Sequence, residues 1–254
     1  MIIINADDWG RSGVETDAAL SCHLKGRITS VSAMVFMQDS ERAAELAKAN
    51  GIDVGLHLNL SQRYNGSVPS PAITAAQDKI VRFMTGSKYA VLFYRPDLRK
   101  CFRDVQQAQT DEFLRLYGKP PSHEDGHQHR HLCANVLLDA VIPFGQKVRR
   151  NFSFWPGEKG LLNRTYRGLV DRWLGRRYRL TDYFFSLGQC LQAKRLGRVA
   201  ELARVSTVEL MTHPVSAHEY DYLTSHEHLR MISGVETGSF ALLGRESAPV
   251  KLAP

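Results

Sequence analysis

Histidine and aspartate side chains are concentrated in residues 123–131, which hold four of the ten histidines of the chain. In an extended strand, side chains two positions apart lie on the same face. Such a strand would carry a row of imidazole and carboxylate groups, namely His123, Asp125, His127, His129 and His131. Imidazole and carboxylate are common ligands of divalent ions. We therefore expect a metal site here; the alternative is a polar loop with coincidental histidines.

Two further segments place polar groups after apolar runs that we interpret as buried strands. Residues 2–5 lead to Asp7 and Asp8, and carboxylates at the end of a buried strand are costly unless they are paired or metal-bound. In residues 53–60, alternating apolar residues leave His57 on the opposite face. We expect Asp8 and His57 to share a metal ion with the histidine row. The alternatives are a surface turn at 7–8 and a hydrogen-bonded core histidine at 57.

Segments typical of strands and helices alternate along the chain. We expect strands over residues 2–5, 28–35, 53–58, 123–131 and 205–211. We expect helices over residues 13–25, 39–49, 97–117, 133–145, 161–174 and 224–233, and only short ones within 61–95. This alternation predicts an α/β fold with a parallel sheet, closed or nearly closed as a barrel. All candidate residues, including His213 after the last strand, then lie at the carboxyl ends of strands, where such folds build active sites.

Length and composition restrict the class of protein. With 254 residues and 43% hydrophobic content, the chain can bury a full core, and α/β barrels often reach this length as one domain. It has no apolar run of about 18 residues that would indicate a transmembrane helix. The chain starts with a predicted strand, so we expect no signal peptide. The four cysteines form no CxxC pair, which favours reduced thiols and a cytoplasmic location.

Positive charge is concentrated in residues 147–179, which carry ten basic and two acidic side chains in a chain of total charge +7. A single basic segment on a near-neutral body indicates a local anionic partner and argues against nucleic acid. Within it, residues 161–174 have the apolar spacing of an amphipathic helix. That helix either packs on the barrel with a solvated basic face, or contacts an anionic membrane surface or a phosphate-bearing glycan. Membrane contact would place the protein at the inner membrane face.

Five short motifs, at residues 5–10, 29–32, 55–60, 123–131 and 209–214, occur in an order that resembles the YdjC-like carbohydrate deacetylases, which include chitooligosaccharide deacetylases. The resemblance spans about residues 1–60 and 120–235. It implies a distorted (β/α) TIM-like barrel, with residues 1–254 as one domain. Residues of about 61–120 and 147–205 show no match and are expected to shape the substrate pocket.

The resemblance also implies an activity, namely metal-dependent hydrolysis of the N-acetyl group of an amino sugar with release of acetate. The cofactor would be one divalent ion, Mg, Mn, Zn or Co. By position, Asp7 would be the general base and His213 the general acid. The alternatives are another metal-dependent hydrolase, such as a phosphoesterase or amidase, and a non-catalytic carbohydrate-binding relative.

The same resemblance suggests the ligands of the ion. Asp8, His57 and His127 would bind the metal, with His129 as the alternative to His127. Neighbouring groups of the histidine stretch, Asp125 and His131, would hold the ligand imidazoles in one tautomer, as groups behind metal ligands usually do.

Overall fold

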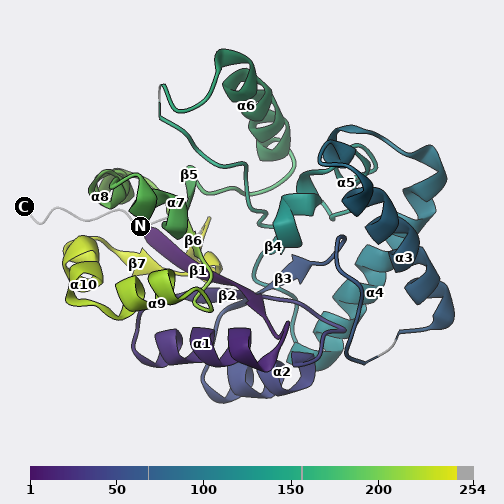
Figure 1. Ribbon diagram of the computed structural model, residues 1–254, viewed down its shortest axis with the longest axis horizontal. Helices are drawn as coiled ribbons and strands as arrows, with labels where there is room; N and C mark the ends of the chain where they lie inside the picture. The colour runs from purple at the N-terminus through teal and green to yellow at the C-terminus, as the bar shows by residue number, and fades with distance from the viewer. Residues whose placement is uncertain (68, 156, 245–254) are drawn as a thin grey trace, which may run out of the picture.

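The computed structural model describes residues 1–67, 69–155 and 157–244, and its centre is a parallel sheet (Figure 1). The strand order is β4-β3-β2-β1-β6-β5, and β7 pairs with the first residues of β1. The strands are β1 (Ile2–Trp9), β2 (Ser30–Ala33), β3 (Val54–Leu58), β4 (Glu124–Gly126), β5 (Tyr183–Ser186), β6 (Val208–Thr212) and β7 (Thr237–Gly238). Pairings between these strands are all parallel, so the predicted sheet type is confirmed.

An irregular segment, residues 147–153, lies between β4 and β5, the strands at the two edges of the sheet. The backbone N–H of Arg149 donates to the carbonyl of Glu124 in β4 at 3.1 Å, and the N–H of Ser153 donates to the carbonyl of Phe184 in β5 at 2.8 Å. The sheet therefore curls into a distorted half-barrel. Backbone groups of this segment form hydrogen bonds with some of the unpaired backbone groups at the two sheet edges. The expectation of a distorted barrel is confirmed.

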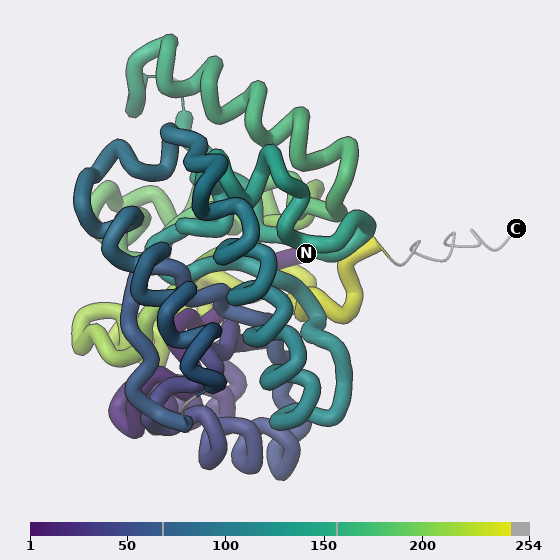
Figure 2. Tube along the Cα trace, turned by 90° about the vertical axis from the view of Figure 1, so that its right-hand side faces the viewer, coloured from purple at the N-terminus to yellow at the C-terminus, as the bar shows by residue number. Residues whose placement is uncertain are grey.

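Helices surround the sheet, and α6 stands apart from the others (Figures 1 and 2). The helices are α1 (Gly13–Leu24), α2 (Ser40–Ala49), α3 (Pro71–Gly86), α4 (Arg99–Tyr117), α5 (Ala134–Leu138), α6 (Leu161–Gly175), α7 (Leu187–Gln192), α8 (Leu196–Val205), α9 (Ala217–Thr224) and α10 (His226–Ile232). The 3₁₀ turns are η1 (Ala90–Leu92), η2 (Pro96–Leu98), η3 (His127–Leu132) and η4 (Phe240–Leu242). Of the helices described, none has the length and apolar character needed to cross a bilayer.

The histidine stretch does not form the single strand that the sequence suggested. Strand β4 ends at Gly126, and residues 127–132 form η3 instead. The chain turns because Gln128 and His129 take φ values of 53° and 56°, in the left-handed region that side chains other than glycine rarely adopt. The expected row of histidines on one strand face is therefore wrong.

Other expected elements also differ from the structure. The helix expected over 133–145 is the short α5, which ends at Leu138. Residues 61–95, expected to hold only short helices, contain the 16-residue α3. Its start is defined by Ser70, whose side chain accepts a hydrogen bond from the backbone N–H of Ile73, followed by Pro71 at the first helical position.

The close packing of the sheet interior depends on Gly55 in β3. A Cβ added there would meet Cε1 of His123 at 2.2 Å. That ring cannot easily move, since it stacks on Phe240 with 3.7 Å between ring centroids and lies 3.0 Å from the Ser32 hydroxyl. The His123 ring therefore lies against the backbone of β3 at a position where only glycine leaves room for it.

We expect Gly55→Ala to lower the free energy of unfolding by about 1–3 kcal/mol, because the buried ring must be displaced. Urea denaturation followed by circular dichroism measures this loss. Gly86→Ala is the matched control, since nothing lies within 4 Å of a Cβ at the end of α3. Equal unfolding midpoints for the two variants would contradict the packing argument.

Candidate metal centre and active site

Two adjacent aspartates enter the site from the end of β1. Neighbouring side chains of a regular strand point to opposite faces. Here the register of β1 against β2 shifts between Ala6 and Trp9, and Asp8 has a φ of 65°. Such backbone strain in a non-glycine residue is typical of functional sites. Because of it, Asp7 and Asp8 each bring a carboxylate oxygen within 4.8 Å of a ring nitrogen of the same histidine, His57.

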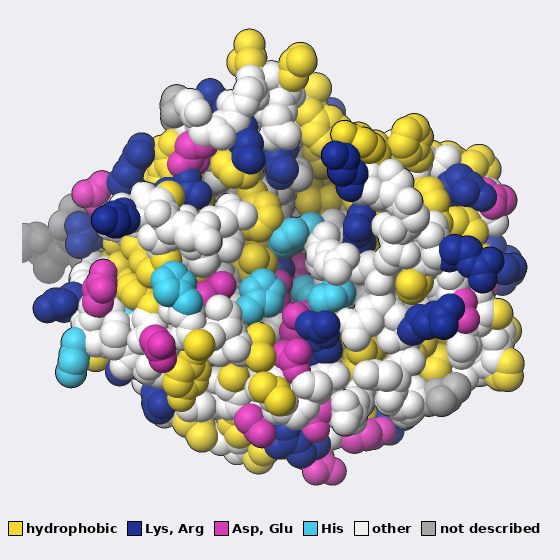
Figure 3. Space-filling view, viewed as in Figure 1, with side chains coloured by type: hydrophobic (Ala, Val, Ile, Leu, Met, Phe, Trp, Pro, Cys, Tyr) yellow, Lys and Arg dark blue, Asp and Glu magenta, His cyan; other side chains and the backbone are white. Residues whose placement is uncertain are grey.

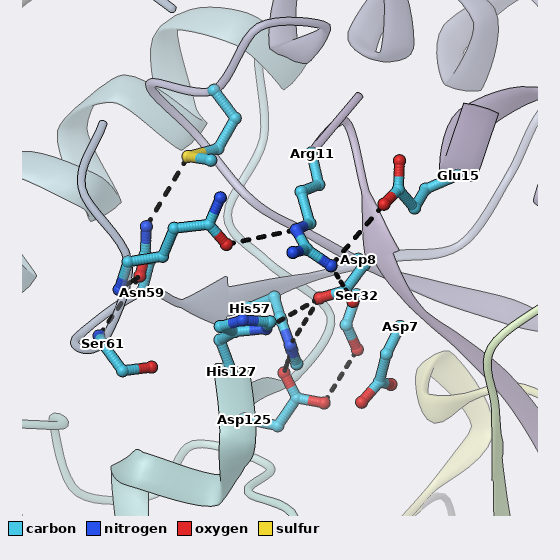
Figure 4. A network of polar contacts seen from close by, with 12 residues as sticks. Asp7, Asp8, Arg11, Glu15, Ser32, His57, Asn59, Ser61, Asp125 and His127 are labelled. Atoms are coloured by element: carbon cyan, nitrogen blue, oxygen red, sulfur yellow. Dashed lines mark hydrogen bonds and ion pairs between the residues drawn. The ribbon is translucent and has the colours of Figure 1, made fainter. Parts of the chain in front are cut away.

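Asp8, His57 and His127 form a compact group at the ends of β1, β3 and β4 (Figure 4). One donor atom from each lies within 4.8 Å of the others, and all three side chains are buried. Oδ1 of Asp8 is 2.9 Å from Nδ1 of His127 and 3.4 Å from Nε2 of His57. One carboxylate and two imidazoles fit a divalent ion with coordination positions left open for water and substrate. The structure therefore brings together the three residues named as ligands from the sequence.

The alternative residue, His129, lies elsewhere. Its ring packs against Phe152 and Phe184, with centroid distances of 4.6 and 5.7 Å. Burial, together with the charge of Arg149, lowers the pKa of His129 to about 3. The left-handed turn at residues 128–129 separates it from the group around Asp8, so the geometry favours His127.

Asp125 fixes the orientation of the His57 ring. Its Oδ1 is 2.7 Å from Nδ1 of His57, which leaves Nε2 facing Asp8. Carboxylates behind a ligand histidine act in this way at metal sites. Burial alone would lower the pKa of His57, but the charges of Asp125 and Asp7 raise it to about 10. Without a metal, the imidazole thus keeps a proton that an ion would displace.

The expectation for His131 is wrong. Its Nε2 is 3.0 Å from the backbone carbonyl of Arg149, and it makes no hydrogen bond with a proposed ligand imidazole among the described residues. It therefore fixes the segment 147–153 and acts on the site through that backbone.

Arg149, which the sequence placed only within the basic segment, is the main partner of Asp7. Two of its guanidinium nitrogens lie 2.7 Å from the two Asp7 oxygens. The same fully buried side chain is 2.7 Å from Oδ2 of Asp125 and 2.6 Å from Oε1 of Glu209. Burial by itself would raise the pKa of Asp7, but the charge of Arg149 holds it below its ordinary value. Asp7 is therefore ionised and held in one orientation.

His213 directly follows the neighbouring strand, β6. Thr212, the last residue of β6, pairs with Ala6 of β1, so His213 follows at the level of Asp7. Its backbone N–H donates to Glu219 at 2.8 Å, and the Thr212 hydroxyl donates to the same carboxylate at 2.7 Å. The half-buried imidazole makes no hydrogen bond or ion pair with the described part of the chain, which leaves it available to a substrate.

A cavity of about 690 Å³ lies between α6, η1 and η3, and none of the proposed metal ligands lines it. Its lining includes residues 128–130, which directly follow His127 along the chain. Among the residues that the structure describes, its lining includes no acidic side chain and four basic ones, Lys88, Arg130, Arg150 and Arg167. Figure 3 shows histidine and acidic side chains gathered at the centre of this face, below α6.

Comparisons with known proteins agree with this geometry. The family model for YdjC-like proteins matches residues 1–237. Human carbohydrate deacetylase is 31% identical over 84% of this chain and 74% of its own length, and the carbohydrate deacetylase of Vibrio campbellii is 26% identical over 92% and 82%. The crystal structure of a putative cellobiose-phosphate cleavage protein from Enterococcus faecalis, 17% identical, shares the fold with a TM-score of 0.66 over 94% of this chain and 97% of that one. The chain belongs to the YdjC-like family.

Proposed function

We propose that this protein is a metal-dependent N-deacetylase that hydrolyses the N-acetyl group of an amino sugar and releases acetate. The observation that carries the proposal is the convergence of Asp8, His57 and His127 beside a separate buried carboxylate, Asp7. Binding a metal alone would not require that second carboxylate. The relatives named carbohydrate deacetylase support the class of substrate.

The side chains divide the proton transfers of amide hydrolysis between them. A divalent ion held by the three ligands, Mg, Mn, Zn or Co, would supply a Lewis acid for the acetyl carbonyl and the attacking water. Asp7, ionised and held by Arg149, accepts the proton of the water as its oxygen bonds to the acetyl carbon. His213 donates a proton to the sugar nitrogen as the C–N bond breaks. The products are acetate and a free amino sugar.

The position of Arg149 argues against a two-metal phosphoesterase. Asp7, His57 and Asp125 form a second group of close metal-type donors. However, the guanidinium lies 2.7 Å from both of these carboxylates and already supplies a positive charge there. A second ion about 3.5–4 Å from the first, as in two-metal enzymes, would be repelled. The site therefore supports one ion.

The cavity between α6, η1 and η3 would hold the part of the substrate that lies beyond the N-acetyl group. Its walls carry the rings of Tyr89, Phe152 and Tyr166, in keeping with the mostly apolar walls of small-molecule sites. Lys88 and Arg130 also line it and make no ion pair with any described residue, and Nε of Arg130 is buried without a hydrogen-bond partner. These cations, which no described carboxylate neutralises, suit a phosphate-bearing glycan.

Protein treated with EDTA and reloaded with Mg, Mn, Co or Zn should bind one ion per chain and release acetate from N-acetylated chitooligosaccharides. Asp8→Ala and His57→Ala should lose the ion, because each removes a ligand, whereas His129→Ala should keep it. Metal analysis after gel filtration and an enzymatic acetate assay measure both quantities. Loss of the ion in His129→Ala but not in His127→Ala would contradict the ligand set. Phosphate release from phosphate esters without acetate release would contradict the activity.

Asp7→Asn should keep the metal ion but lower kcat by about 10²–10⁴, because an amide cannot accept the proton of water. Steady-state acetate release, together with metal content, separates loss of the base from loss of the site. Asp17→Asn, at an exposed position of α1, is a matched control that should leave kcat unchanged. An Asp7→Asn protein with normal kcat would remove Asp7 from the mechanism.

Arg149→Met should lower the free energy of unfolding by about 3–5 kcal/mol, since it leaves buried carboxylates without their cation. Arg63→Met is the control: this arginine pairs with Asp78, and the two side chains are 73% and 40% exposed. Its loss should cost about 1 kcal/mol or less. Chemical denaturation of both variants tests the difference, and equal losses would show that the buried cluster does not depend on Arg149.

A further inference from the structure

Residues 161–169 of α6 bury no apolar side chain in the core of the protein. Leu161, Leu162 and Leu169 are 77%, 88% and 63% exposed. In the helix only Leu174 is buried, and contact with the apolar core is limited to the C-terminal part, from Val170 onward. Figures 1 and 2 show the helix projecting from the body. Large apolar side chains exposed together mark an interaction surface.

Uncompensated positive charge accompanies these leucines. Arg164, Arg172 and Arg176 are exposed and take part in no ion pair with the residues that the structure describes. A helix with an apolar face, flanking arginines and few acids has the composition of helices that lie in the interface of a bilayer. Each such cation near an anionic lipid surface contributes about 1 kcal/mol of attraction.

A second exposed apolar segment lies across the cavity from α6. Tyr89, Leu92 and Phe93, in and next to η1, are 55%, 53% and 61% exposed. Tyr89 and Leu92 line one wall of the cavity, and Leu162 and Tyr166 of α6 line the same cavity. Figure 3 shows hydrophobic side chains along this upper edge, with lysine and arginine side chains between them. Both sides of the cavity mouth are thus apolar and basic.

We propose that α6 and the η1 segment dock on an anionic phospholipid bilayer, so that the cavity opens toward a lipid-anchored N-acetylated glycan. The substrate part rests on the proposed deacetylation, whereas the docking does not. Charge complementarity selects this occupant, because the apolar side chains lie among free arginines that anionic headgroups would neutralise. A second copy of the chain would bring a like-charged face against this one, which is unfavourable.

Flotation of the full-length protein with vesicles tests the docking. We expect binding to vesicles of phosphatidylcholine mixed with phosphatidylglycerol, no binding to phosphatidylcholine alone, and weaker binding at high salt. Leu161→Glu combined with Leu169→Glu should reduce the apparent affinity roughly tenfold or more, since it adds anions to the docking face. Neither leucine lines the cavity. Leu24→Glu is the control, since this leucine, the last residue of α1, is 65% exposed.

Acetate release from soluble N-acetylated chitooligosaccharides, measured on the same preparations, tests the deacetylase separately and should be equal in the double variant and the control. No binding to either kind of vesicle, equal binding to both, or equal loss in both variants would overturn the docking even if acetate release is normal. A dimer seen by light scattering and dissolved by the double variant would assign this face to a second copy and also overturn it. Vesicle binding without acetate release from any preparation would overturn the deacetylase and leave the docking supported.

Discussion

One buried guanidinium allows three carboxylates to be buried next to one another. Asp7, Asp125 and Glu209 come from β1, β4 and β6, and Arg149 contacts each of them at 2.6–2.7 Å. Asp7 and Asp125, whose pKa values the charge of Arg149 holds low, would cost several kcal/mol each as buried anions without it, whereas burial raises the pKa of Glu209 to about 8. Arg149 lies on the segment 147–153. The backbone of this segment hydrogen-bonds to β4 at Arg149 and to β5 at Ser153. The segment that joins the two edges of the sheet therefore also carries the side chain that brings the acidic groups together.

The positions of the ligands depend on a second layer of hydrogen bonds, centred on the Ser32 hydroxyl. The hydroxyl of Ser32 is 2.7 Å from Nδ2 of Asn5, 2.8 Å from Oδ2 of Asp125 and 3.0 Å from Nε2 of His123. Asp125 in turn holds His57. Buried polar networks whose members are satisfied are rigid, because breaking one bond leaves a buried group without a partner. This rigidity supports the strained backbone at Asp8, whose left-handed conformation would otherwise relax.

Asp8 and His57 were predictable because each lies at the end of an apolar strand, and the carboxyl ends of parallel strands meet at one rim. His127 follows no apolar run, and its choice from the histidine stretch rested on the family resemblance. Arg149 was not predictable, since it stands among other arginines and its partner Asp7 is 142 positions away. Nothing in its neighbours distinguishes a buried arginine from a solvated one. The turn in η3 was equally hidden, because alternating histidines resemble a strand and the left-handed φ values occur at Gln128 and His129 rather than at glycine. Strand β5 was missed because its aromatic run lies in a segment without a clear helix or strand period.

The exposed part of α6 is not explained by the packing that stabilises the other helices. Helices of about 15 residues are marginally stable alone in water, and most of their stability in proteins comes from packing an apolar face. In α6 that packing is confined to the turns around Leu174, while Leu161, Leu162 and Leu169 contribute nothing to the core. Selection for folding alone would favour polar side chains at these positions, since exposed leucines promote aggregation. Their presence next to free arginines and a substrate-sized cavity is accounted for by a surface that covers them during function. The polar interior around Arg149 and the apolar surface of α6 would then serve one task, bringing an acetylated sugar from an interface to a site formed by buried charges.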